Sequence, residues 1–543
     1  MSTTERDNAA PEMPLTITGP AAGIRALARV EARRLLKHPA LLGSLALCLG
    51  LWIYTTVVSG STDYPVLHDE DRYLQSQLLV PAAGTFLAMH LAVLRPSRED
   101  TDAWFQALVL QPWQRAVAHL LAVIPAVVLT ALLGGARMLW LSLLPGAVGS
   151  PSPSELATGP ALVLLAGTLA VLTGMITRSV AAGPIVLGLV GIATVVAGLA
   201  PFSGWRWWGP VALEDSSRSS LPSGLLYRPA VWHLLYLLLL AAAVAVVAVL
   251  RSGLRTRVVQ VAFALALVGA VAAGAIQLRP TPDSVTAARE HALKSPADEQ
   301  RCVHQGQLTY CAYPEFVDRH QQWSKVVEGV LRWAPERVRA EKYTVRQHVG
   351  PFTESTGLSR IQIPVDSWAE DDRRAGTPGA VVVGTDWGNG SDSGDDATIG
   401  LATAFAERLV EGSAPEGSGT RQGGPVGGVE SMVCGSRSVV MLWLAGQATQ
   451  ETGTALRSQL DRSFGGLVHF GKLTMIRTRR ADAETALRLL DQPTNQVGNK
   501  VNRHWDELTD PDTTSAQAAQ LLGVRAPAAP TADEGEAPLC VRD

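Results

Sequence analysis

The chain has 543 residues, of which 47% are hydrophobic and 17% are charged, and its formal net charge is -3. A near-neutral chain lacks the concentrated basic face that phosphate backbones require, so we expect no nucleic-acid partner. The apolar residues are concentrated between about residues 40 and 278. The sequence therefore predicts an α-helical polytopic membrane bundle followed by a soluble α+β domain. The predicted regions are a disordered leader at 1–20, a cytoplasmic amphipathic helix at 21–39, a transmembrane domain at 40–278 and an extracytoplasmic domain at 279–543.

The first predicted element is an amphipathic helix. The leader before it is polar and does not resemble a secretory signal peptide. Between Ile24 and Leu36, apolar residues alternate with arginines at helical spacing, which is typical of a helix that lies on an anionic membrane surface. His38 and Pro39 should end this helix, because the residue before a proline disfavours helical geometry.

Seven windows are long and apolar enough to cross a bilayer, for which about 20 residues are needed. The fourth window is short, and only a few polar residues around Arg178 separate it from the fifth, so these two are also compatible with a tight helical hairpin of the same topology. The windows are 40–58, 78–94, 116–144, 161–176, 182–200, 231–250 and 258–278.

The distribution of positive charge predicts the orientation of these spans, since lysine and arginine stay in cytoplasmic connections. Cations precede the first span, follow the second span, and occur in the connection 251–257 between the sixth and seventh spans. The connections on the other side are acidic, uncharged or nearly neutral. The N-terminus is therefore expected in the cytoplasm of a multi-pass plasma-membrane protein, and residues 279–543 are expected outside.

The cytoplasmic connection between the second and third spans predicts a short helix with an acidic first turn and an apolar face. Its pattern is R-x-D-x-D-x-W-F-x-A-L. Together with the amphipathic arm and the first span, this pattern resembles ABC-2-type transporter permeases. The residues that carry the resemblance are Arg98, Asp100, Asp102, Ala103, Trp104, Phe105, Ala107 and Leu108.

The resemblance implies that Asp100, Asp102, Trp104, Phe105 and Leu108 form a coupling helix, which docks on a separate ABC ATPase subunit. It also implies a homodimer or heterodimer of permeases in contact with membrane lipids. The family core would cover about residues 20–251, with six spans and both termini inside, so the seventh span and the exported domain depart from it. In the family, the connection between spans five and six forms short helices at the outer surface, which Phe202, Trp205, Trp207 and Trp208 would suit.

Arg137 is the one strongly charged residue well inside an apolar window. As an intramembrane cation it is a candidate to line a pathway for an anionic or lipid-like substrate. The alternative is an interfacial position: a span that starts near residue 116 reaches the outer surface near residue 136, where an arginine can extend its charge into water. We favour the interfacial position.

Four cysteines lie in the expected outer domain, where oxidising conditions allow disulfides to persist. Cys302 and Cys311 flank a predicted hairpin turn at Gln305 and Gly306, so we expect a bridge between them. Cys434 and Cys540 would form the second bridge. Four buried free thiols are the alternative.

The remainder of the outer domain alternates strand-like and helix-like stretches, which favours an α+β fold. Strands are expected at 358–365 and 380–387, and helices at 316–334, 397–412, 437–460 and 515–524. The stretches 388–396 and 411–428 are predicted to be flexible loops. No H-E-x-x-H zinc motif, G-x-S-x-G elbow or phosphate-binding loop occurs in the sequence, and we expect no metal, no cofactor and no catalytic residue.

The leading interpretation is thus the transmembrane permease subunit of an ATP-driven exporter, with ATP hydrolysed by another chain. One alternative is a membrane-anchored protein whose outer domain binds or senses a ligand. A second, weaker alternative is a degenerate membrane metallopeptidase that depends on residues such as His504 or Glu407.

Overall fold

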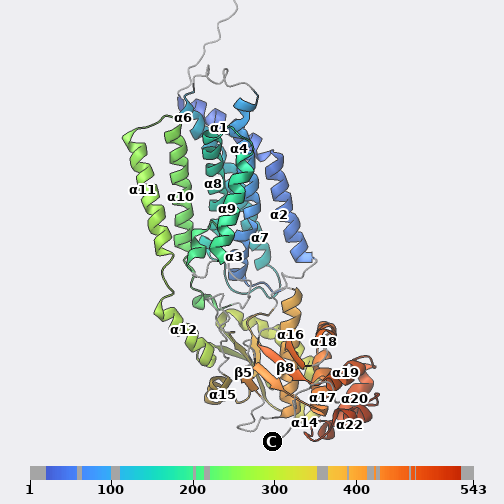
Figure 1. Ribbon diagram of the computed structural model, residues 1–543. Helices are drawn as coiled ribbons and strands as arrows, with labels where there is room; N and C mark the ends of the chain where they lie inside the picture. Colours follow the sequence, from blue (N-terminus) through green and yellow to red (C-terminus); the bar gives the residue numbers. More distant parts are fainter. Residues whose placement is uncertain are drawn as a thin grey trace, which may run out of the picture.

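The computed structural model describes residues 20–57, 64–99, 110–199, 204–212, 221–350, 365–387, 391–412, 421–423, 429–463, 466–470 and 473–526. A long helical bundle carries helix α1 at one end and the C-terminal domain, which comprises the described residues from 279 onward, at the other (Figure 1). We call these two ends of the bundle the α1 end and the domain end. The sequence prediction of a helical membrane bundle followed by a separate domain with sheets agrees with this architecture.

Six helical segments among the described residues are long and apolar enough to cross a membrane. Two of them consist of a pair of consecutive helices. The segments are α2 (Pro39–Val57), α3 with α4 (Leu67–Gln77 and Leu79–Arg98), α6 with α7 (Pro112–Ala122 and Ile124–Ser142), α8 (Pro153–Ile176), α10 (Ala230–Arg251) and α11 (Arg257–Ile276). The predicted fifth span corresponds to α9 (Ala182–Leu199), which is apolar but shorter.

The predicted spans needed two corrections. The third window was expected to be one helix, but it divides at Val123 because Pro125 cannot supply a backbone donor inside a continuous helix. The fourth window was expected to be short, yet α8 begins at Pro153 and includes Glu155 in its first turn. Proline at the first helical position costs no hydrogen bond, so the helix extends into residues 153–160, which were predicted to belong to the connection.

Helix α1 (Pro20–Leu36) confirms the predicted amphipathic helix. Its buried face consists of Ala28, Glu31, Ala32 and Leu35, which follow helical spacing, while its arginines are mostly exposed. The Glu31 carboxylate lies 3.0 Å from Arg95 Nη1 near the end of α4. Apolar packing and this ion pair together hold α1 across the end of the bundle (Figure 1).

The connection between α9 and α10 contains two short 3-10 helices, η1 (Trp205–Trp208) and η2 (Ser223–Leu225). Trp207 is buried, and its carbonyl accepts a hydrogen bond of 2.6 Å from Gln277, just after α11. Phe202 lies outside the described residues. This connection therefore fastens α9, α10 and α11 together at the domain end.

The C-terminal domain contains two four-stranded sheets with strand orders β1-β2-β3-β4 and β5-β6-β8-β7. Both sheets are mixed, because β2, β3 and β4 pair in parallel, as do β6 and β8, while the remaining pairs are antiparallel. The strands are β1 (Arg301–Gln305), β2 (Leu308–Ala312), β3 (Tyr343–His348), β4 (Val381–Gly384), β5 (Arg421–Gly423), β6 (Val429–Met432), β7 (Gly466–Phe470) and β8 (Thr474–Thr478).

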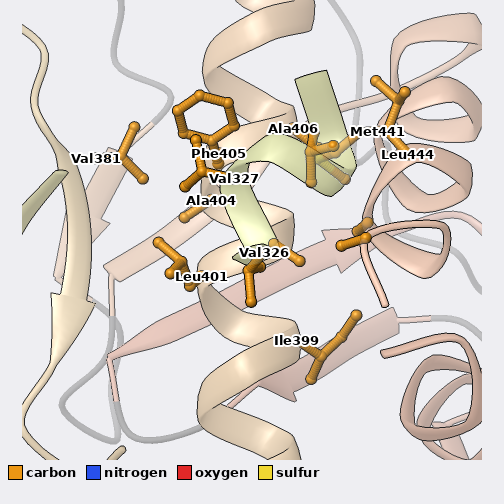
Figure 2. Packing of buried hydrophobic residues seen from close by; sticks show 14 of the residues in the cluster. Val326, Val327, Val381, Ile399, Leu401, Ala404, Phe405, Ala406, Met441 and Leu444 are labelled. Atoms are coloured by element: carbon orange, nitrogen blue, oxygen red, sulfur yellow. The ribbon is translucent and has the colours of Figure 1, made fainter. Parts of the chain in front are cut away.

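Helices connect and cover these strands. They are α12 (Asp283–Lys294), η3 (Pro296–Glu299), η4 (Pro314–Arg319), α13 (His320–Leu331), α14 (Glu336–Arg339), α15 (Val365–Arg374), α16 (Ser391–Glu411), α17 (Ser436–Gly446), α18 (Gln450–Ser463), α19 (Arg480–Leu490), α20 (Thr494–Arg503), α21 (Trp505–Leu508) and α22 (Ser515–Leu522). Helix α16 is central, because it packs against α13, α17 and β4 within one apolar cluster (Figure 2).

Most predicted elements of the C-terminal domain are present, including strand 380–387 and the helices around 316–334, 397–412 and 515–524. The single helix predicted at 437–460 is wrong, because it is interrupted near Gln447 and forms α17 and α18. The loop predicted at 388–396 is also wrong in part, since α16 already begins at Ser391. The strand predicted at 358–365 lies outside the described residues except for Val365, which starts α15.

The apolar core of the C-terminal domain extends into the bundle. Val66, Val148, Leu221 and Leu225 lie in connections of the bundle, yet they are buried in the same cluster as Phe316. The predicted boundary at residue 279 therefore separates the two parts in sequence but does not mark the edge of this core.

His348 makes the stability of this domain dependent on pH. Its ring is buried at the end of β3, 3.9 Å from the Trp368 ring, and neither of its ring nitrogens has a hydrogen-bond partner among the described residues. Burial lowers the pKa of His348 well below its usual value, and nearby Arg346 acts in the same direction. The folded domain thus holds this ring neutral.

We expect His348 to destabilise the domain as the pH falls below about 6.5, because the unfolded chain then binds a proton that the folded chain does not. The loss is about 1.4 kcal/mol per pH unit. Asp372 acts oppositely, because burial, only partly offset by Arg346, raises its pKa to about 6. Thermal midpoints of the wild type and His348→Phe, measured at pH 7.5, 6.5 and 5.5, separate the contribution of this histidine from that of other groups. The variant should lose less stability than the wild type as the pH falls. His304→Phe, at an exposed position, should keep the wild-type pH dependence.

Candidate functional site

The residues predicted to form the coupling helix, Asp100, Asp102, Trp104, Phe105 and Leu108, lie outside the described residues, but both flanks of that stretch are described. Before it, Arg95 pairs with Glu31 of α1. After it, the side chain of Leu110 packs closely on Gly23 of α1. A β-carbon added at Gly23 would lie only 3.1 Å from that side chain. Both flanks of the predicted coupling segment therefore lie against α1, at the α1 end of the bundle.

Arg137 lies on α7, close to the domain end of α2. Its Nη1 donates a hydrogen bond of 3.2 Å to Thr56, next to the last residue of α2, and its guanidinium lies over the rings of Trp140 at 4.8 Å and Trp52 at 5.6 Å. Arginine stacked between aromatic rings at a helix end is the arrangement expected at a membrane interface. The geometry therefore favours the interfacial position over a contact with substrate inside the bundle.

The predicted disulfide between Cys302 and Cys311 is present. The two residues face each other in the β1–β2 hairpin, whose turn uses Gly306 at φ +63°, and their sulfur atoms are 2.01 Å apart. Cys434 is also disulfide-bonded, while its predicted partner Cys540 lies outside the described residues. Among the cysteines that the structure describes, Cys48 in α2 is free and buried.

A buried polar junction, which sequence reasoning missed, joins the C-terminal domain to the bundle. Arg319, at the end of η4, is completely buried. Its Nη1 donates to the Trp387 carbonyl at 2.5 Å, and its Nη2 donates to the Tyr64 carbonyl at 2.9 Å. Tyr64 precedes α3 and has a left-handed backbone with φ 54°, which is uncommon for a residue other than glycine. The guanidinium thus links the end of β4 to the first connection of the bundle.

Burial lowers the pKa of Arg319 to about 9, an effect that Asp386 and Asp69 oppose. The group remains a cation at neutral pH, and its positive charge is balanced by carboxylates from both the domain and the bundle. A second link lies close by, because Glu315 accepts a hydrogen bond of 3.0 Å from the backbone nitrogen of Ser223 in η2. The two links place the C-terminal domain directly over the domain end of the bundle.

A cluster of buried charges lies inside the bundle below this junction. Asp71 of α3 accepts a hydrogen bond of 2.6 Å from the Ser152 nitrogen at the start of α8, where a carboxylate is favourable against the helix dipole. Glu155 in the first turn of α8 lies 2.7 Å from Arg228 and also accepts a hydrogen bond from Gln75. In the sequence these acidic residues stand beside apolar windows, a pattern that is typical of solvent-exposed connections, whereas the structure buries them.

We expect Glu155 and Arg228 to be strongly coupled. Their side chains are 5% and 10% exposed, so removing either one leaves the other as an uncompensated buried charge, which costs about 3–5 kcal/mol. Glu155→Gln and Arg228→Met should each lower the thermal midpoint, and the double variant should lose less than the sum of the two. A double-mutant cycle should give a coupling energy of about 1–3 kcal/mol.

The exposed pair Glu290 and Lys294 in α12 provides the matched control for this cycle. Its side chains are 62% and 52% exposed, so water screens the two charges and its coupling should be far smaller than that of Glu155 and Arg228. Equal coupling energies for the two pairs would contradict the structural role assigned to Glu155 and Arg228.

The residues considered for a peptidase site are not brought together with a histidine pair. Glu407 is buried within α16, and His504 lies 3.4 Å from Glu507 at the start of α21. Within the part of the chain that the structure describes, no group of three or more histidine, cysteine, aspartate or glutamate side chains is placed to hold a metal ion.

No protein-family model matches this chain, and no curated protein or solved structure matches it.

Proposed function

We propose that the chain is the transmembrane permease subunit of an ATP-driven exporter of the ABC-2 type, with ATP hydrolysed by a separate subunit. The observation that carries the proposal is the arrangement at the α1 end. Both flanks of the acidic-then-apolar segment 100–109 lie against α1, and α1 is fastened to α4 through Glu31 and Arg95. Movement of a partner bound to this segment would therefore displace α1 and α4 together.

The proposal includes seven crossings, with α9 as the fifth. At its start, the Ser179 carbonyl lies 3.2 Å from His90 of α4, and at its end α9 reaches η1 near Gly209. Helix α10 then runs back in the opposite direction. At its start, His233 lies 3.3 Å from the Pro210 carbonyl of the same connection, and after its end, Ser252 contacts Met175 at the end of α8. With 18 residues, α9 measures about 27 Å, close to the thickness of a hydrocarbon core.

Seven crossings place the C-terminal domain on the side opposite α1. The connections at the α1 end are rich in arginine, which the positive-inside rule assigns to the cytoplasm. The bridge between Cys302 and Cys311 is consistent with an oxidising outer compartment for the other end. The proposed localisation is a plasma membrane with the N-terminus inside, and the active unit is a homodimer or heterodimer of permeases in contact with lipids and an ABC ATPase.

Affinity purification of the full chain from its native membranes in mild detergent tests the proposal. We expect a stoichiometric partner that contains a phosphate-binding loop, together with ATP hydrolysis in the purified complex. A chain that purifies alone, under conditions that keep other transporters intact, would contradict the proposed function.

A second candidate function is ligand binding by the C-terminal domain, with the bundle as an anchor. An open groove of about 380 Å³ beside the β1–β2 hairpin favours it, because His304, His320, Lys325 and Glu328 offer both charges and ring nitrogens there. In this case a ligand should bind equally well in the presence and absence of any ATPase.

A further inference from the structure

A cavity of about 300 Å³ opens at the α1 end of the bundle. It lies where α1, α4 and α6 meet the ends of α8 and α10, elements that gather at this end of the bundle (Figure 1). Its charged and titratable lining consists of Glu31, Arg95, Arg115, His119, Arg178 and Arg251.

The charge of this lining is strongly unbalanced. Four guanidinium groups face one carboxylate, which leaves a surplus of three positive charges with the histidine neutral. The carboxylate of Glu31 is already shared between Arg34 at 3.2 Å and Arg95 at 3.0 Å. Within the described ranges, Arg115, Arg178 and Arg251 form no ion pair, so no described carboxylate is paired with them.

Other residues of the lining add two further requirements for a ligand. His119 carries a buried Nδ1 that has no hydrogen-bond partner in the described structure, although buried polar atoms normally have one. Beside it, Leu27, Val93 and Met175 form an apolar wall. A matching ligand therefore has acceptor oxygens, negative charge and an attached apolar group.

Helix dipoles account for part of this arrangement. Helices α4, α8 and α10 all end at this face, and a cation near a helix C-terminus is favourable. This effect explains why arginines occur at each end separately. It does not explain why four of them line the same cavity as Leu27, Val93 and Met175.

We propose that this cavity binds the phosphate headgroup of an anionic membrane lipid, with the guanidinium groups of Arg115, Arg178 and Arg251 on the phosphate oxygens and the acyl chains along the apolar wall. Basic pockets between membrane helices on the cytoplasmic side are known to hold phosphate headgroups. The lipid would join α1, α6, α8 and α10 at the α1 end. This proposal does not depend on the exporter function.

The test uses the full chain reconstituted into vesicles of phosphatidylglycerol and phosphatidylcholine in equal amounts, followed by extraction and measurement of the lipid retained per protein. We expect selective retention of phosphatidylglycerol by the wild type. Replacing the three arginines together by glutamine should lower that retention more than about tenfold, because it removes the guanidinium groups placed on the phosphate oxygens. Replacing all three by lysine should preserve much of it.

The matched control is the triple glutamine variant at Arg25, Arg29 and Arg33, which are exposed on α1 and do not line the cavity. It removes the same charge from the same face and should retain the lipid. Equal losses in both triple variants, or equal retention of phosphatidylcholine, would overturn the proposal. If the cavity variant does not fold, its three single glutamine variants replace it.

A separate arm adds inorganic phosphate or glycerol 3-phosphate to the purified protein. Failure of these soluble anions to displace phosphatidylglycerol at millimolar concentration supports a lipid occupant. Displacement that is lost in the cavity variant would overturn the lipid assignment and identify a soluble phosphate compound as the occupant.

Discussion

Replacing Trp104 and Phe105 by alanine should abolish ATP-driven transport and leave membrane insertion intact. Both large apolar side chains lie in a segment whose flanks are at the α1 end, and large apolar side chains at an aqueous surface commonly form a partner's contact. Truncating them removes most of the apolar area from the proposed contact with the ATPase. We expect loss of co-purifying ATPase, loss of substrate export and an unchanged thermal midpoint.

The control for this experiment is Trp113→Ala combined with Leu121→Ala. Both residues lie on α6 near the α1 end and are partly or largely exposed. This variant loses similar apolar area near the same face but outside segment 100–109, so ATPase binding and transport should persist. If the Trp104 and Phe105 variant keeps its partner and its transport rate, segment 100–109 is not the coupling helix.

The membrane half of the fold was predictable because a bilayer imposes one strong rule, that backbone groups bond internally within long apolar helices. The limits of single helices were less predictable. Helix α8 extends through Glu155 because Arg228, 73 residues away, neutralises that carboxylate inside the fold. A carboxylate with a distant partner cannot be distinguished by sequence from one that lies in water.

The hairpin of β1 and β2 was predictable for a different reason. Its turn glycine and both cysteines lie within a few residues, so local geometry specifies the pairing. Strand β3 was missed, because its sequence YTVRQH contains the buried side chains of Arg346 and His348. Arg346 donates a hydrogen bond of 2.6 Å to Asp372. Because this partner is distant in sequence, the hydropathy of the stretch does not indicate a buried strand.

The junction between bundle and domain was the largest omission. Arg319 and Tyr64 are 255 residues apart, and Arg319 lies in a stretch that reads as an ordinary amphipathic helix. Arg319 is completely buried only because the C-terminal domain packs on the helical bundle, and the sequence predicts these two parts separately. The α+β prediction likewise gave no parallel pairing, because the crossovers that connect β2, β3 and β4 became visible only with the intervening helices in place.

Arg319→Ala should release the C-terminal domain from the bundle. The change removes both hydrogen bonds to the carbonyls of Tyr64 and Trp387 and the buried positive charge near Asp69 and Asp386, although Asp69 keeps its ion pair with Arg72 at 3.1 Å. Removing one member of a buried charge network costs about 3–5 kcal/mol. We expect a lower thermal midpoint, faster backbone hydrogen exchange around Tyr64, and cleavage by protease in the connection around residues 279–282.

Two further variants separate docking from general destabilisation. Arg332→Ala, at an exposed position at the end of α13, should leave all three measurements at wild-type values. Arg319→Lys keeps the positive charge, but the lysine ammonium has one nitrogen where the guanidinium has two terminal nitrogens. It should therefore restore the charge but not both hydrogen bonds to the carbonyls, and its hydrogen-exchange protection should lie between those of the wild type and Arg319→Ala. Because Arg319 spans bundle and domain, the protection lost in Arg319→Ala should appear on both sides of the junction, near Tyr64 and near Trp387. Protection lost only within the domain would mean that Arg319 stabilises η4 alone, and that the apolar contacts of Val66, Val148 and Leu221 are sufficient to hold the domain on the bundle.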